Sequence, residues 1–210
     1  MYIAGRWADR QLSRLELVIV VIVLSLVLFV FMHYMLRMFA IAERSLLANS
    51  VININSAIQY RAAGYALRRD YASLEAMQGM NPFTMSDLDP GWLDPESGDG
   101  RPQEMLTGIP FMRVPGNYLG ELDNPDPAEI GGRQWYFNLR DRTLVYRVDN
   151  TEYFDSSLPG PPRVVFTVKI DYQDRNTNNK FDPVVDEYLG IRLQAVNEYG
   201  WHYNFTGEGD

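Results

Sequence analysis

The chain has 210 residues, of which 46% are hydrophobic and 22% charged, a composition typical of one folded domain with an appendage. It contains no cysteine, which excludes disulfides, thiolate metal ligands and thiol nucleophiles. Residues 1–44 hold five arginines and three acidic residues, whereas residues 45–210 hold 14 basic and 24 acidic side chains. Because such an acidic surface repels phosphate backbones, we expect no nucleic-acid partner.

An uncharged apolar run extends from Leu17 to Leu36. As a helix it would span roughly 30 Å, the thickness of the hydrocarbon core of a bilayer. It therefore predicts a single transmembrane helix. Arg6, Arg10 and Arg14 precede the run, and this bias favours a cytoplasmic N-terminus with the C-terminal body exported.

The alternative is a cleavable signal peptide with a small-residue site at Ala40-Ile41-Ala42, which would release a secreted domain. The apolar run is longer than the usual signal-peptide core. Helical spacing also continues beyond that site, in the apolar stripe Leu47, Val51, Ile54, Ile58, Ala62 and Tyr65. We therefore expect one continuous helix of about fifty residues, half in lipid and half on a soluble domain.

Glu16 lies at the cytoplasmic edge of the apolar run, in the string Leu12-Ser13-Arg14-Leu15-Glu16-Leu17-Val18-Ile19-Val20. A carboxylate there is costly unless it snorkels or is paired, and Arg14 is close in sequence. The string resembles the start of type IV pilins and type II secretion pseudopilins, in which a glutamate is the fifth residue of a long apolar helix. The resemblance implies a helix packed along an antiparallel sheet, and an assembly role for Glu16.

The same alignment makes Leu12 the first mature residue, preceded by Gln11. The prepilin peptidase of that family needs glycine where Gln11 stands, so we expect the chain to remain uncleaved. Three short phrases further resemble accessory pilin-like proteins of MSHA-type pilus systems: Gly79-Met80-Asn81-Pro82-Phe83, Tyr118-Leu119-Gly120-Glu121 and Trp135-Tyr136-Phe137-Asn138.

Turn residues dominate the middle of the chain, and strand patterns follow it. Residues 79–132 are rich in Pro, Gly and Asp. This segment is expected to drape over the sheet, pinned by Phe83, Leu88, Trp92, Leu93, Phe111 and Tyr118. After Gly132, period-two alternation predicts five strands of an antiparallel meander, near 135–138, 143–148, 166–172, 189–195 and 199–205.

The predicted fold class is therefore α+β, a pilin-like long N-terminal helix on an antiparallel β-meander. The expected organisation is a cytoplasmic segment (1–16), a transmembrane helix (17–36), an amphipathic helical continuation (37–78), a loop-rich segment (79–132) and a β-sheet domain (133–210).

Catalytic ingredients are few, so we expect no enzyme. The chain has two histidines, His33 and His202, without a recognisable partner in sequence, and it has no phosphate-binding Gly loop and no HExxH motif.

One polar loop has the spacing of a calcium site. Asp174, Asn176, Asn178 and Asp182 occupy loop positions 1, 3, 5 and 9, with the Lys180 carbonyl at position 7. Asn179 at position 6 can adopt the left-handed conformation usually given to glycine. Val185 replaces the usual bidentate acid, and Asp186 follows it. The sequence thus leaves two possibilities open, a weak calcium site or an Asn-rich turn.

The leading hypothesis is a single-pass protein of a bacterial inner membrane with a periplasmic domain. It would act in MSHA-type pilus biogenesis or type II secretion-like filament assembly by packing against pilin-like subunits and inner-membrane assembly proteins. The alternative is an unrelated bitopic protein whose exported β-domain binds a ligand or calcium.

Overall fold

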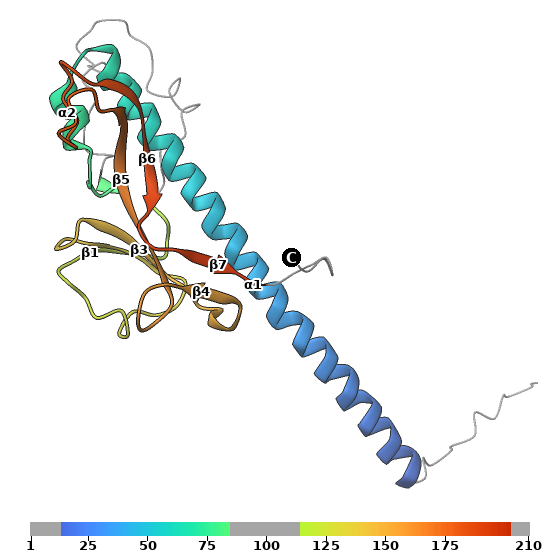
Figure 1. Ribbon diagram of the computed structural model, residues 1–210. Coiled ribbons are helices and arrows are strands. Elements are labelled where there is room, and N and C mark those ends of the chain that lie inside the picture. Colours follow the sequence, from blue (N-terminus) through green and yellow to red (C-terminus); the bar gives the residue numbers. More distant parts are fainter. Residues whose placement is uncertain (1–13, 85–113, 203–210) are drawn as a thin grey trace, which may run out of the picture. The chain divides into compact units, whose positions relative to one another are not determined.

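The computed structural model describes residues 14–84 and 114–202 (Figure 1). The chain divides into two compact units, Met1–Ile41 and Ala42–Asp210. Leu88, Trp92, Leu93, Phe111, Tyr203 and Phe205 from the predictions above lie outside the described residues, as does Gln11.

A single helix, α1, runs from Arg14 to Leu67 over 54 residues, which confirms the predicted continuous helix. In the first unit the apolar residues of α1 from Leu15 to Phe39 are exposed, and the mean hydropathy of the helix reaches 3.1 over an 18-residue window. Ser25 donates its hydroxyl to the Val21 carbonyl at 2.8 Å, so the helix itself satisfies this polar group. By length and composition the segment is a candidate for a membrane span or a signal sequence.

In the second unit, the predicted apolar stripe of α1 faces the core. Leu47, Ile54, Ile58, Ala62 and Tyr65 are all buried. The helix ends at Leu67, and Arg69 adopts a positive φ of 58°. Asp70 then caps the short helix α2 (Tyr71–Ala76) by accepting the Ser73 amide at 3.1 Å. The helical continuation expected to residue 78 is thus interrupted by a turn.

The core of the second unit is built on a five-stranded sheet in the order β1-β2-β3-β5-β6. Its strands are β1 (Tyr118–Leu122), β2 (Trp135–Asn138), β3 (Thr143–Arg147), β5 (Arg163–Gln173) and β6 (Glu187–Ala195). All neighbours are antiparallel except β1 and β2, which are parallel. The sheet is therefore mostly antiparallel, and it confirms the α+β class.

Two features of the sheet differ from the predicted meander. β1 was missed because its five residues lie between turn sequences that mask the strand pattern. The last strand, β7 (Tyr199–Trp201), pairs with β4 (Phe154–Ser156) in a separate two-stranded sheet. The meander prediction was wrong there because alternation marks a strand but does not name its partner.

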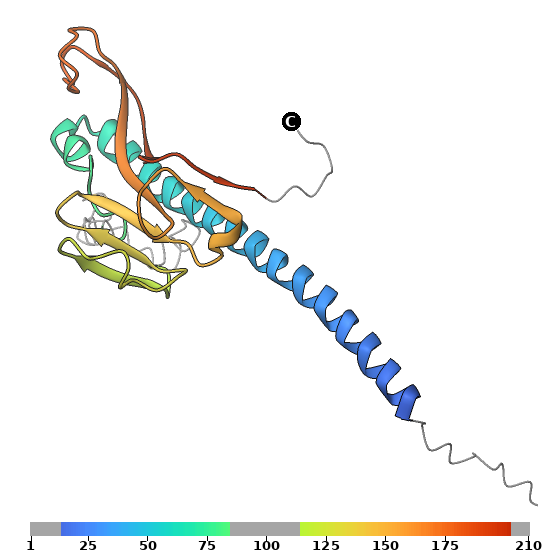
Figure 2. The same cartoon turned by 60° about the horizontal axis from the view of Figure 1, so that its bottom comes forward.

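The β5–β6 hairpin extends past the rest of the sheet, toward the end of the unit where α2 lies (Figures 1 and 2). Phe166, Val168 and Ile170 on β5 are buried, as their alternation predicts. Leu189 lies at the register shift, between the partners of Asp171 and Tyr172, and is 64% exposed. The Asn-rich loop lies at the tip of this hairpin, where residues 175–180 are exposed and Phe181 is buried.

Candidate functional site

A buried glutamate joins α1 to the loop that follows β3. Glu43 is 1% exposed. Its Oε1 accepts the Tyr146 hydroxyl at 3.1 Å and the Asp149 amide at 2.8 Å. Its Oε2 accepts the backbone amide and the side-chain amide of Asn150 at 2.9 and 2.5 Å. Four donors thus satisfy a buried carboxylate, which is the condition for burying it without a large penalty.

The surroundings of Glu43 also change the pKa of the Tyr146 hydroxyl. Burial, followed by the negative charge of Glu43, raises the pKa of the Tyr146 hydroxyl far above its usual value. The phenol therefore remains a donor to Glu43 throughout the physiological range. The sequence contained a signal for the burial of Glu43, though not for its partners, because Glu43 lies four residues before Leu47 on the buried stripe of α1.

Glu16 and Arg14 lie in the first turn of α1, within the first unit, and both are exposed. An acidic residue in this turn is favoured by the partial positive charge of the helix N-terminus.

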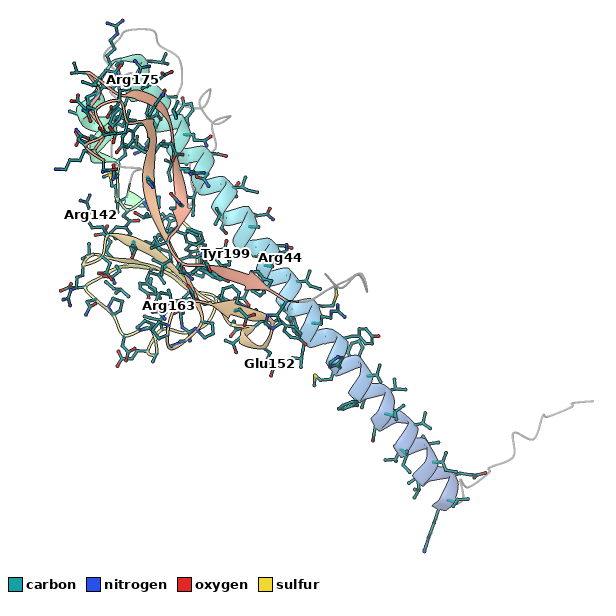
Figure 3. All side chains as sticks on the ribbon, viewed as in Figure 1. Arg44, Arg142, Glu152, Arg163, Arg175 and Tyr199 are labelled. Atoms are coloured by element: carbon teal, nitrogen blue, oxygen red, sulfur yellow. The ribbon has the colours of Figure 1, made fainter. Side chains whose placement is uncertain are left out.

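The predicted calcium residues all lie in the connection between β5 and β6, at the hairpin tip where Figure 3 labels Arg175. Asp174 accepts the amides of Asn178 and Asn179 at 3.3 and 2.8 Å. Asn176 accepts the Asn178 amide at 3.1 Å, and Asn178 accepts the Lys180 amide at 2.7 Å. Asn179 has a φ of 59°, so the predicted left-handed conformation at position 6 is confirmed.

Asp186 lies against this loop, as it must if it replaces the acidic ligand that is missing at Val185. A turn at Asp182 brings the Asp186 amide to the Asp182 carbonyl at 2.7 Å. The Asp186 carboxylate then accepts the amides of Arg175 at 2.9 Å and Asp182 at 2.7 Å. Asp186 therefore bridges the start and the end of the loop.

The donor chemistry suits a hard cation only in part. Within the stretches that the structure describes, no three His, Cys, Asp or Glu side chains gather closely enough to hold a metal ion. A cation would therefore depend on amide and carbonyl oxygens as well as on Asp174, Asp182 and Asp186. The same oxygens already order the loop by accepting backbone amides.

An open depression of about 530 Å³ lies beside this loop, lined by α2, by Arg142 and by the segment from Tyr172 to Phe181. Arg142, labelled in Figure 3, donates to the carbonyls of Gln78 and Gly79 at 3.1 and 3.3 Å. Its guanidinium is therefore engaged in holding the chain after α2.

The segments Gly79–Phe83, Tyr118–Glu121 and Trp135–Asn138 meet in space. Asn81 is buried, and its amide nitrogen donates to the Tyr118 hydroxyl and to Glu121, both at 2.8 Å. The ring of Phe83 lies 4.5 Å from that of Tyr118 and 6.4 Å from that of Trp135, measured between centroids. Segments separated by up to about fifty residues thus form one contact network at the β1–β2 edge of the sheet.

His202 has partners that its sequence context did not reveal. Its Nδ1 lies 3.0 Å from Asp155 Oδ2, and its Nε2 lies 3.0 Å from the Glu152 carbonyl. These contacts tie the end of β7 to β4 and the turn before it. These contacts hold the two chain segments together, and no nucleophile takes part in them.

Comparison with known proteins does not assign this chain to a family, because no family model, curated protein or solved structure matches it. What is established is a long apolar N-terminal helix followed by a β-domain.

Proposed function

We propose that this chain is a membrane-anchored, pilin-like component that acts in assembly of an MSHA-type pilus or a related type II secretion-like filament. In this proposal it is a single-pass protein of a bacterial inner membrane, with Arg14 and Glu16 at the cytoplasmic edge and the β-domain in the periplasm. Its chemistry is packing against pilin-like subunits and assembly proteins, without catalysis.

The observation that carries the proposal is the outward face of α1 in the second unit. Over residues 45–67, no exposed position is charged, and Arg61, which is half-buried, is the only charged residue. Leu46, Ile52 and Leu67 are 63%, 60% and 86% exposed. The solvent face of a helix on a soluble domain usually carries charged side chains. A face of small, amide and apolar residues suits packing against another helix.

The contact network around Asn81, Tyr118 and Trp135 gives secondary support. The phrases of the resemblance come from three separate segments, yet each contributes a side chain to one network.

Charge placed on the outward face of α1 tests the proposal. Ile52→Glu should reduce copurification of the full chain with coexpressed pilin-like subunits several-fold, because a carboxylate would be desolvated at the helix contact. The matched control is Leu189→Glu, since Leu189 on β6 is similarly exposed at 64%. Equal recovery of partners with the parent, Ile52→Glu and Leu189→Glu chains would contradict the proposal.

A second candidate function is an exported calcium-binding module on a membrane anchor. The order of the 174–186 loop favours it, because Asp174, Asn176 and Asn178 each turn an oxygen back onto the loop. A calcium-dependent rise in thermal stability tests this candidate, as described in the Discussion.

A further inference from the structure

Two like charges lie directly opposite each other on the outer face of the β5–β6 hairpin. Lys169 pairs with Arg192 in the register of the two strands, and both side chains are exposed. Opposed residues in antiparallel strands have Cβ atoms about 5 Å apart, and like charges there destabilise the pair. Asp171 neutralises Arg192 at 2.9 Å. Within the described part of the chain, Lys169 has no ion pair, so an uncompensated cation stands on a rigid strand.

The complementary charge lies at the opposite edge of the same sheet. Glu121, Asp123, Asp126 and Glu129 are exposed on β1 and the connection after it, and no basic residue occurs between Val114 and Gly132. We call residues 121–129 the acidic edge. Asp126 accepts the Ala128 amide at 2.9 Å and Glu121 accepts the Asn81 side chain. The carboxylates of Asp123 and Glu129 are in no ion pair with the residues that the structure describes.

The order of the strands prevents these charges from meeting within one molecule. β1 and β6 are the two edges of the five-stranded sheet, and neighbouring strands are about 4.8 Å apart. Glu121 on β1 and Lys169 on β5 are therefore separated by roughly 15 Å of sheet. Within the acidic edge, the Pro127 carbonyl accepts a hydrogen bond from Arg147 of β3 at 3.0 Å. In two copies placed side by side, by contrast, the acidic edge of one can lie against Lys169 and Arg192 of the next.

We propose that the Lys169–Arg192 pair docks the acidic edge of a second copy of this chain. The contact is heterologous, because different surfaces of the two copies meet, and a contact of this type can be repeated along a row of copies. This goes beyond the proposed function, since packing of α1 against other pilin-like subunits requires no second copy of this chain.

Engineered disulfides in the full chain, held in membranes, test the contact. The chain has no cysteine, so every cross-link is an introduced one. Gly190→Cys places a thiol opposite Asp171, where a Cβ meets nothing within 4 Å, and Ala128→Cys places one within the acidic edge. Two differently tagged chains, one with each cysteine, should cross-link on mild oxidation, whereas each variant expressed alone should not.

Charge reversal then separates specific docking from random collision. Lys169→Glu keeps the Arg192–Asp171 pair, and it should lower the yield of the mixed cross-link about threefold, as expected for loss of an exposed ion pair. Asp123→Lys with Glu129→Lys in the copy bearing Ala128→Cys should restore the yield. Arg140→Glu, in the exposed β2–β3 turn, is the matched control and should leave it unchanged.

The proposal is overturned if no mixed cross-link forms, if Gly190→Cys alone cross-links equally well, or if Lys169→Glu has no more effect than Arg140→Glu. Because the Ile52→Glu experiment measures recovery of other subunits, its outcome is independent of this one.

Discussion

The Glu43 carboxylate accepts the Tyr146 hydroxyl at 3.1 Å across 103 residues of sequence. This bond, together with the amides of Asp149 and Asn150, holds the first turns of α1 in the second unit to the end of β3. The Glu43 carboxylate thus joins the helix to the sheet. Local sequence alone does not predict this contact.

We expect Glu43→Ala to destabilise the protein by about 3 kcal/mol, since two backbone amides and a hydroxyl would lose their buried acceptor. In thermal melts of the detergent-solubilised chain, this corresponds to a fall in Tm of roughly 6–12 °C. Glu129→Ala, which removes an exposed carboxylate, should melt like the parent. Similar melting of Glu43→Ala and the parent would show that the cluster contributes little.

Alkaline pH should destabilise the fold through its buried tyrosines. Burial is the largest cause that raises the pKa of the buried Tyr136 and Tyr146 and of the half-buried Tyr118 and Tyr188. A raised pKa in the folded state means that the unfolded chain loses these protons first, near pH 10. The contribution to stability is therefore complete below about pH 10 and declines as pH rises above it.

Tyr146→Phe separates the two roles of that hydroxyl. The variant should melt lower than the parent at pH 8, by roughly 2–4 °C, because Glu43 loses one hydrogen bond. Between pH 8 and 10.5 its Tm should fall less steeply than that of the parent, because one titrating group is gone. Parallel curves for the two proteins would contradict the assignment.

Glu16→Ala tests the assembly role proposed for Glu16. If Glu16 meets a cationic group of a neighbouring subunit, the variant should copurify several-fold less with pilin-like partners, because the charge pair lies in a low-dielectric region. Glu16→Asp, which keeps the charge, should retain part of the association. Assembly and copurification like those of the parent would identify Glu16 as a snorkelling residue.

Calcium should stabilise the hairpin if the 174–186 loop binds it. With so few carboxylates we expect a Kd of about 10⁻⁴–10⁻³ M, so a tenfold excess of calcium would add about 1.4 kcal/mol. Melts of the full chain should shift upward by roughly 3–6 °C relative to chelator. Asp174→Ala should abolish the shift and Asp126→Ala, in another turn, should preserve it. Identical melts with calcium and chelator would leave an Asn-rich turn.

The N-terminus should remain intact, because Gln11 is bulky where a prepilin peptidase needs a small residue. Intact-mass measurement of membrane-extracted protein should therefore give residues 1–210. A chain that begins at Leu12 would refute this prediction, and a chain that begins at Glu43 would identify a cleaved signal peptide.

Periodicity predicted the parts of the fold that repeat locally. The stripe from Leu47 to Tyr65 and the β2–β3 hairpin follow directly from 3.6- and 2-residue spacing. Pairings between distant segments were not predictable in this way. β1 runs parallel to β2, β7 pairs with β4, and His202 reaches Asp155, and each of these is decided by tertiary packing.

The two candidate sites also differ in whether the sequence could predict them. The Asn-rich loop was found because its residues are contiguous, and the left-handed Asn179 followed from its position. Glu43 was missed because its donors lie more than a hundred residues away, and an acidic residue after an apolar run is ordinarily assumed to be solvated.

The separation between Glu43 and Asn150 also sets an order of events during synthesis. The ribosome adds roughly 5–20 residues per second. The 107 residues between Glu43 and Asn150 therefore take on the order of 5–20 s to be made, and only then can Glu43 form its hydrogen bonds to Asn150. Until then the stripe from Leu47 to Tyr65 has no sheet to cover it. A newly made chain therefore carries a hydrated glutamate just beyond its apolar run. If that run spans a membrane, as proposed, this charge opposes sliding of the unfinished helix deeper into lipid.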